Sequence, residues 1–170
     1  AYAVIAYVAF FVQIMIQSVG DGSQPLISVY RGAGDADAVR RLRNTNYLVA
    51  IAFGFVGLGI MFAVRNAIPL LFGASDIVKP VIAYALPVFS ICYIFYGFTH
   101  TTTSYFYAVD DSRSSNTLVI AEAIIVCVVV FIMGLLFQVD GIWFSPTVLQ
   151  MLLCIIAGTL LYRRHKAQKE

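Results

Sequence analysis

The stretch YLVAIAFGFVGLGIMFAV, from Tyr47 to Val64, decides the fold class because it contains no charged side chain. A helix needs roughly 18–20 mostly apolar residues to cross the hydrocarbon of a bilayer, and this run is of that length. Two further runs also lack formal charge, Val81 to Val109 and Gly141 to Tyr162. In lipid the backbone must satisfy its own hydrogen bonds, which a helix does. The sequence therefore predicts an all-α, polytopic transmembrane helix bundle.

The composition of the whole chain agrees with this prediction. Hydrophobic residues make up 61% of the 170 residues and charged residues 12%, about half the roughly 25% charged residues of soluble domains. Such a chain has too few polar side chains to cover the surface of a soluble protein. The motifs HExxH and GxSxG and a glycine-rich phosphate loop are absent from the sequence, so no enzyme is predicted. The three cysteines lie singly in different apolar runs, which predicts neither a disulfide nor a metal site.

The apolar runs divide the chain into one transmembrane domain, residues 1–170, with five predicted spans. Short polar connections separate the spans, and a basic cytoplasmic tail, residues 163–170, follows the last one. The predicted spans are about 1–30, 46–72, 79–108, 117–138 and 142–162.

The positions of the basic residues predict the direction of the spans. The connections at 31–44 and 110–116 and the tail at 163–170 carry arginine or lysine, whereas the two other connections carry little charge. Basic segments stay on the cytoplasmic side of a membrane. We therefore expect a multi-pass protein of the cytoplasmic membrane with its N-terminal end outside and its C-terminus inside. Because no signal peptide is visible in residues 1–19, an external N-terminal end implies a preceding span, and we expect the chain to be the C-terminal part of a longer one.

The first span carries a row of polar side chains. Gln13, Gln17, Asp21 and Gln24 are spaced 4, 4 and 3 residues apart, which places them on one face of a helix. Polar groups within a membrane are costly and usually face a cavity or another helix. For Gln17 and Asp21, both a cavity wall and interhelical hydrogen bonding remain open. For Gln13 and Gln24 the structural interpretation is favoured.

The third span carries a second polar face. Tyr96, His100, Thr103 and Tyr107 are spaced 4, 3 and 4 residues apart. Histidine is the side chain that most readily changes charge near neutral pH, but His100 fits equally a neutral hydrogen bond between helices. Glu122 fits either the cytoplasmic interface or a buried protonated carboxyl. The residues predicted to line a substrate or ion cavity are Gln17, Asp21, Tyr96, His100 and Thr103.

Four segments of the chain, in order, resemble segments of the multidrug and toxic compound extrusion (MATE) transporters. GDGSQPLISVYRGAGDADAVRR (Gly20 to Arg41) resembles the signature of family helix eight, with Gln24-Pro25 and Gly32-Ala33. Pro69 to Val88 is similar to the link between helices nine and ten, Phe95 to Asn116 to helix ten and its loop, and Gly141 to Pro146 to the entry of helix twelve. The resemblance implies a partial C-terminal six-helix lobe, from helix eight to helix twelve, of a twelve-helix protein.

The resemblance also implies a function. MATE transporters export organic cations and drugs in exchange for protons or sodium, so it implies a small organic cation as substrate and the missing N-terminal lobe as partner. It implies a coupling ion but no cofactor, no metal site and no nucleic acid. Some branches carry coupling acids in helices seven and ten, but residues 79–108, which resemble helix ten, contain neither Asp nor Glu. Asp21 is unusual for the helix-eight signature, and no family role is carried over to it.

Other functions remain as alternatives. One is a lipid-linked oligosaccharide flippase of the same superfamily. Another is a non-transporting membrane assembly subunit, in which the polar rows would hold helices together. A membrane-embedded enzyme is the least supported of these hypotheses.

Overall fold

The computed structural model describes residues 2–167, and these residues form helices joined by short turns. The elements are α1 (Tyr2–Gly32), α2 (Ala36–Val64), α3 (Ile68–Leu71), α4 (Lys79–Ser90), α5 (Cys92–Ala108) and α6 (Ser112–Ala167). Four helices or helix pairs are long and apolar enough to cross a membrane, namely Tyr2–Gly32, Ala36–Val64, Lys79–Ala108 and Ser112–Lys166. The prediction of an all-α polytopic helix bundle is confirmed. Of the predicted basic tail, residues 168–170 lie outside the described residues.

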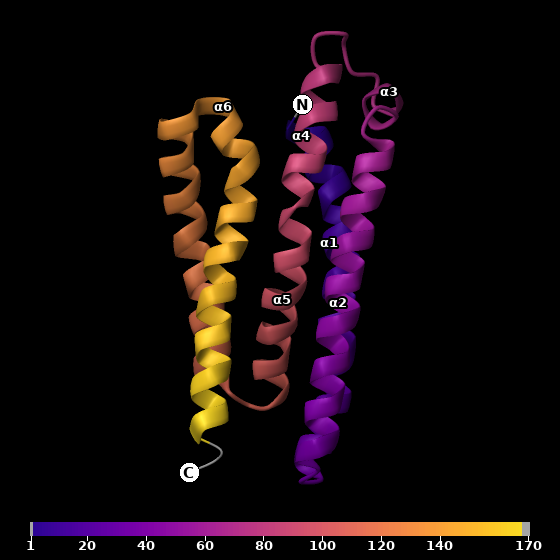
Figure 1. Cartoon of the computed structure of the whole chain (residues 1–170). Coiled ribbons are helices and arrows are strands. Elements are labelled where there is room, and N and C mark those ends of the chain that lie inside the picture. Colours follow the sequence, from indigo (N-terminus) through magenta and orange to yellow (C-terminus); the bar gives the residue numbers. More distant parts are fainter. Residues whose placement is uncertain (1, 168–170) are drawn as a thin grey trace.

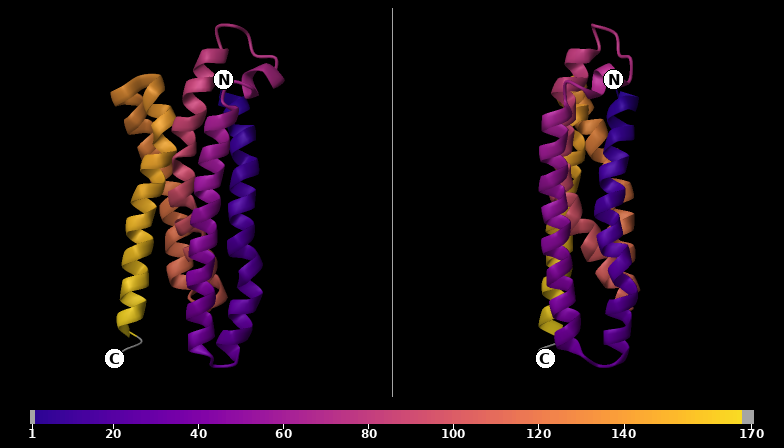
Figure 2. Two further views of the ribbon diagram at one scale, coloured as in Figure 1. Left: turned by 45° about the vertical axis from the view of Figure 1, so that its right-hand side comes forward. Right: turned by 90° about the vertical axis from the view of Figure 1, so that its right-hand side faces the viewer.

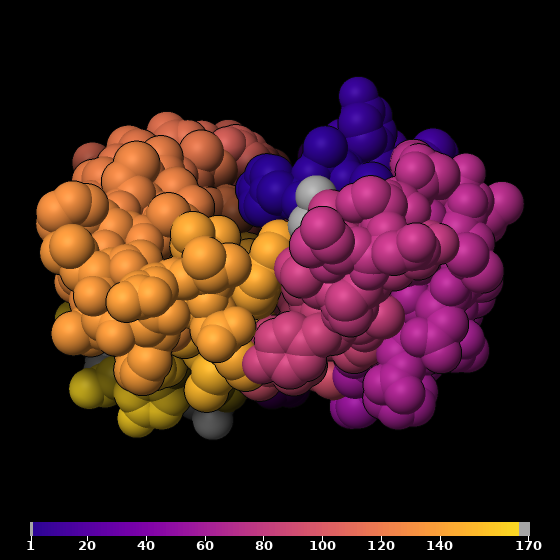
Figure 3. Space-filling model, turned by 90° about the horizontal axis from the view of Figure 1, so that it is seen from above, coloured from indigo at the N-terminus to yellow at the C-terminus, as the bar shows by residue number. Residues whose placement is uncertain are grey.

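The longest helix, α6, consists of two antiparallel arms. Gln138 has φ 53° and ψ −129°, which is not a helical conformation, and the chain reverses its direction there (Figure 1). The polar sequence around Gln138, Asp140 and Gly141 had marked the end of one predicted span and the start of the next. Seen from above, α6 forms one side of the molecule, and α1 to α4 form the other (Figure 3).

Both ends of α2 differ from the predicted span. The α2 helix begins at Ala36, ten residues before the predicted span, because the Asp35 carboxylate caps it by accepting a hydrogen bond from the Ala38 N–H at 2.9 Å. At its other end α2 stops at Val64, and the residues up to Phe72 form a turn and the short α3. Pro69 disfavours a continuous helix here because its ring lacks the N–H and restricts the preceding residue.

The central helix is α5, which packs against α1, α2 and α6. Its fully buried residues include the polar Thr101 and Thr102 as well as Tyr93. The hydroxyls of Thr102 and Thr103 bond carbonyls one turn back, at 2.7 and 3.1 Å. These bonds satisfy polar groups locally, so that polar side chains can occupy the interior of a membrane bundle.

The crossing of α2 and α5 depends on two glycines. A Cβ added to Gly54 would lie 2.8 Å from the Tyr93 carbonyl oxygen, and one added to Gly97 would lie 2.8 Å from the Ala50 carbonyl oxygen. Small residues allow membrane helices to approach this closely. The polar face of α5 is therefore positioned by backbone-to-backbone contact with α2.

The basic end of the bundle holds the α1–α2 connection, the α5–α6 connection and the C-terminal end of α6 (Figure 2). At this end Asp111 accepts hydrogen bonds from the Ser114 N–H at 3.2 Å, the Ser114 hydroxyl at 3.0 Å and Arg164 Nη1 at 2.7 Å. Burial by itself would raise the pKa of the Asp111 carboxyl, but the bonds from Ser114 and Arg164 outweigh it and hold that pKa below its ordinary value. The pair links the start of α6 to its end.

The lowered pKa of Asp111 predicts acid sensitivity. The ionised Asp111 makes its full contribution to the free energy of unfolding above the pKa that this carboxyl has in the unfolded chain, about 4. This contribution is lost as the pH falls below that value and through the lower pKa of the folded state. At pH 7 we expect Asp111→Asn to lower the melting temperature by roughly 2–5 °C, because asparagine keeps the helix cap but not the ion pair. The difference between the melting temperatures of the two proteins should narrow as the pH falls from 7 to 3. The control is the exposed neighbour, Asp110→Asn; an equal loss in the control, or a difference that is as large at pH 3 as at pH 7, would contradict the prediction.

Candidate functional site

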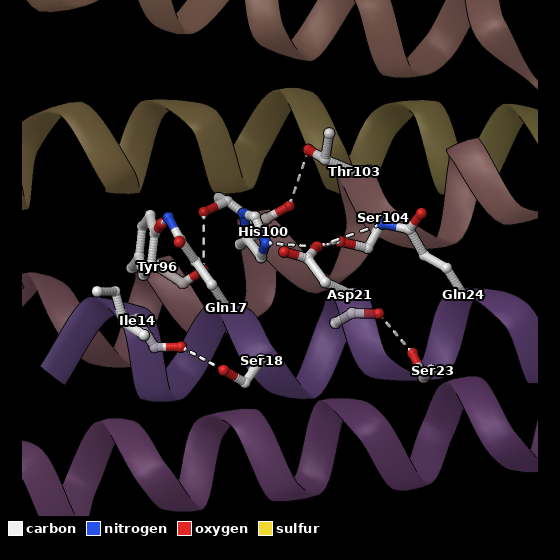
Figure 4. Close-up of polar contacts among 12 residues, drawn as sticks. Ile14, Gln17, Ser18, Asp21, Ser23, Gln24, Tyr96, His100, Thr103 and Ser104 are labelled. Carbon is white, nitrogen blue, oxygen red and sulfur yellow. Dashed lines mark hydrogen bonds and ion pairs between the residues drawn. The ribbon is translucent and has the colours of Figure 1, made fainter. Parts of the chain in front are cut away.

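The polar row of α1 faces the polar row of α5. Gln17 donates a hydrogen bond from its amide to the Tyr96 hydroxyl, and Asp21 lies one turn further along α1, next to His100 (Figure 4). The ring of His100 stacks on that of Tyr96, with centroids 5.6 Å apart. Four of the five residues predicted from the sequence are thus in direct contact with one another across two helices.

Asp21 is the centre of this polar cluster. Its Oδ1 lies 3.1 Å from His100 Nε2 and accepts hydrogen bonds from the Ser104 hydroxyl at 3.0 Å and the Gln24 amide at 3.2 Å. All three contacts involve Oδ1, and within residues 2–167 no partner is found for Oδ2. The Asp21 side chain is 56% exposed. One carboxylate oxygen is therefore fixed by the protein, and the other is available to a ligand.

Gly20 brings α1 close enough to α5 for these bonds. A Cβ at this position would lie 2.8 Å from Ser104 Oγ and 3.3 Å from His100 Cδ2. The two side chains that contact Asp21 therefore occupy the space that any larger residue at position 20 would need.

A cavity of about 320 Å³ opens beside this cluster, between α1, α5 and α6. Its walls carry hydroxyls, an imidazole, an amide and a carboxyl, and no lysine or arginine is among them. The lining residues are Gln17, Tyr96, Thr99, His100, Thr103, Tyr107, Leu118, Val119, Glu122 and Leu153. Asp21 does not line the cavity itself, but it contacts His100, which does. Thr103 lines it, although its hydroxyl bonds only the Thr99 carbonyl.

A buried side chain that the sequence analysis missed, Gln150, lies behind the wall of the cavity and contacts two of its lining residues, Thr99 and Glu122. The Thr99 hydroxyl donates to Gln150 Oε1 at 2.6 Å, and Gln150 Nε2 lies 3.5 Å from Glu122 Oε1. Gln150 is only 5% exposed. It is the only side-chain amide in the charge-free run from Gly141 to Tyr162. This isolated amide is the sequence feature that could have indicated a buried polar contact. Glu122, which the sequence left ambiguous, is exposed and lines the cavity.

The other two residues of the polar row of α1, Gln13 and Gln24, have no side-chain hydrogen bond to another helix among the described residues. Gln24 bonds Asp21 on its own helix. For Gln13, no side-chain hydrogen bond is found within the described part of the chain. Residues 2–167 also contain no cluster of three histidine, cysteine, aspartate or glutamate side chains that could hold a metal ion.

Comparison with known proteins places the chain in a family. No curated protein and no solved structure matches it. The family model described as MatE matches residues 1–133, which is well over half of the chain. Together with the apolar helices, this match makes the chain a multi-pass membrane protein of a transporter family. The chain belongs to the MatE family of transporters.

Proposed function

We propose that this chain forms one wall of the pathway of a secondary active antiporter, which exports organic cations in exchange for protons or sodium. The observation that carries the proposal is the cavity between α1, α5 and α6, which is lined by carboxyl and aromatic groups and, among the described residues, by no lysine or arginine. Carboxylates and aromatic faces attract cations. A phosphate-linked sugar would require cationic partners instead, so the cavity supports an organic cation rather than the substrate of an oligosaccharide flippase.

The exposure of Asp21 supports a second lobe opposite this face. A carboxylate that is 56% exposed on a spanning helix cannot face lipid tails without a large cost. A water-filled pathway between two lobes would solvate it. We propose that the opposite wall is an N-terminal lobe of the same protein, and that the basic end of the bundle faces the cytoplasm.

Filling the cavity tests the proposal directly. Thr103→Leu places a larger side chain in the cavity and so reduces its volume. No bond between helices is lost, since the Thr103 hydroxyl bonds only its own helix. We expect the rate of ethidium efflux from proteoliposomes, driven by an imposed proton or sodium gradient, to fall roughly tenfold because crowding of this order costs 1–3 kcal/mol. The measurement uses the complete gene product that contains this chain.

The matched control is Thr117→Leu, because Thr117 makes the same kind of bond, to the Arg113 carbonyl, at an exposed site outside the cavity. Wild-type protein that moves no cation under either gradient would contradict the proposed function. Equal efflux by Thr103→Leu and wild type would remove this cavity from the pathway. If substitutions in the polar rows lowered only thermal stability, the alternative of a non-transporting assembly subunit would be favoured.

A further inference from the structure

A second pocket, of about 290 Å³, lies at the basic end of the bundle and is not part of the proposed transport cavity. It is formed where the α1–α2 connection, the end of α5 and the end of α6 meet. Its walls contain four arginines and a histidine. The lining residues are Arg31, Gly34, Ala36, Asp37, Val39, Arg40, Arg43, Tyr105, Val109, Arg164 and His165.

The pocket has a surplus of positive charge. Among the residues that the structure describes, Asp37 is the only carboxylate in its lining. Within residues 2–167, Arg31, Arg40 and Arg43 form no ion pair, and Arg43 donates only to the side-chain oxygen of its neighbour Asn44. Like charges gathered in one pocket repel each other unless an anion joins them. The lining therefore has the composition of an anion site.

Tyr105 brings two of the guanidinium groups together. Arg43 Cζ lies 5.3 Å and Arg164 Cζ 5.7 Å from the centroid of its ring. Arg164 gives one nitrogen to Asp111, but its Nε is buried and has no acceptor within the described residues. A buried N–H without an acceptor is costly, so the guanidinium group of Arg164 is only partly satisfied by its bond to Asp111.

The pocket also joins two helices that hardly touch. The α2 helix packs on α1 and α5, and α6 packs mainly on α5, yet Arg40 and Arg43 of α2 and Arg164 of α6 line the same space. Tyr105 belongs to an apolar cluster, and the half-buried Leu42 and Leu161 pack against this cluster. The arginines thus lie where the apolar spans end, which is the level of lipid phosphates.

We propose that this pocket binds a phosphate group, presented by an anionic phospholipid of the adjoining leaflet or as the free anion. Several guanidinium groups are well suited to hold phosphate oxygens. The bound phosphate joins the start of α2 to the end of α6 and stabilises this end of the bundle. The proposal is independent of what the transport cavity carries.

Two matched double variants test the proposal by thermal melting of the purified complete protein in detergent. Arg31→Gln/Arg40→Gln removes two exposed arginines from the pocket, and Arg41→Gln/Arg113→Gln removes two exposed arginines that do not line it. The probes are phosphatidylglycerol, phosphatidylcholine as neutral lipid, and inorganic phosphate. We expect phosphatidylglycerol, but not phosphatidylcholine, to raise the melting temperature of the wild type and the control. In the pocket variant its apparent affinity should fall roughly tenfold or more, since hydrogen bonds to a charged group contribute about 1.5–3 kcal/mol each and only the pocket arginines can donate them to the bound phosphate.

The three probes distinguish the two sources of phosphate. A shift with phosphatidylglycerol alone assigns the site to lipid, whereas an equal shift with inorganic phosphate that competes with the lipid assigns it to the free anion. No response of the wild type to either probe, or equal losses in both double variants, overturns the proposal. If Arg31→Gln/Arg40→Gln does not fold, the single variants Arg31→Gln and Arg40→Gln, compared with Arg41→Gln, provide the same comparison.

Discussion

Asp21→Asn is expected to slow ion-driven transport strongly while the protein stays folded. Asparagine keeps an oxygen at the position of Oδ1, which can still accept the bonds from His100, Ser104 and Gln24. It removes the negative charge and replaces the unpartnered Oδ2 with an amide donor. The substitution therefore separates the charge of the carboxylate from its structural bonds.

The expected loss is roughly tenfold or more in the initial rate of gradient-driven ethidium efflux, because a charge within a membrane protein contributes strongly to ion binding. The rate is measured in proteoliposomes from pH 6 to pH 8, alongside the melting temperature of each protein.

The control is Asp140→Asn, which removes the same charge from an exposed site at the turn between the two arms of α6. Unchanged efflux by Asp21→Asn across the pH range would exclude Asp21 from the mechanism. A lower melting temperature with normal transport would instead identify the polar row of α1 as a structural contact between helices.

Gly97→Ala is expected to cause the largest loss of stability among these variants. The added Cβ would lie 2.8 Å from the carbonyl oxygen and 3.0 Å from the carbonyl carbon of Ala50. These are backbone atoms, so no side chain can rotate away, and α2 and α5 must move apart. Overpacking of this kind costs about 1–3 kcal/mol, which corresponds to a fall of roughly 3–10 °C in melting temperature.

Gly59→Ala provides the matched control because no atom lies within 4 Å of its added Cβ. In that control the higher helix propensity of alanine should leave stability unchanged or slightly raised. Since α5 carries Tyr96 and His100, the Gly97→Ala molecules that remain folded should also transport more slowly than the wild type. Equal melting temperatures for Gly97→Ala and Gly59→Ala would show that α2 and α5 do not cross as closely as the structure has them.

Much of the candidate site followed from helical periodicity. The spacing of Gln17 and Asp21 placed them on one face of a helix, and the spacing of Tyr96, His100 and Thr103 placed these on one face of another. Both inferences are local, since the backbone hydrogen bonds of a helix fix the angle between successive side chains. Nothing local indicated that these two faces meet, because Asp21 and His100 are 79 residues apart.

The sequence by itself determined that this is an all-helical membrane protein, because its long charge-free runs can satisfy the backbone within lipid only as helices. It also determined which polar residues share a helix face. Only the tertiary structure decided which faces oppose each other, that Glu122 lines the cavity and contacts the buried Gln150, and that arginines from α1, α2 and α6 gather in one pocket. The reason is that helix pairing depends on where backbones approach closely, as at Gly20, Gly54 and Gly97, and such contacts join residues far apart in the chain.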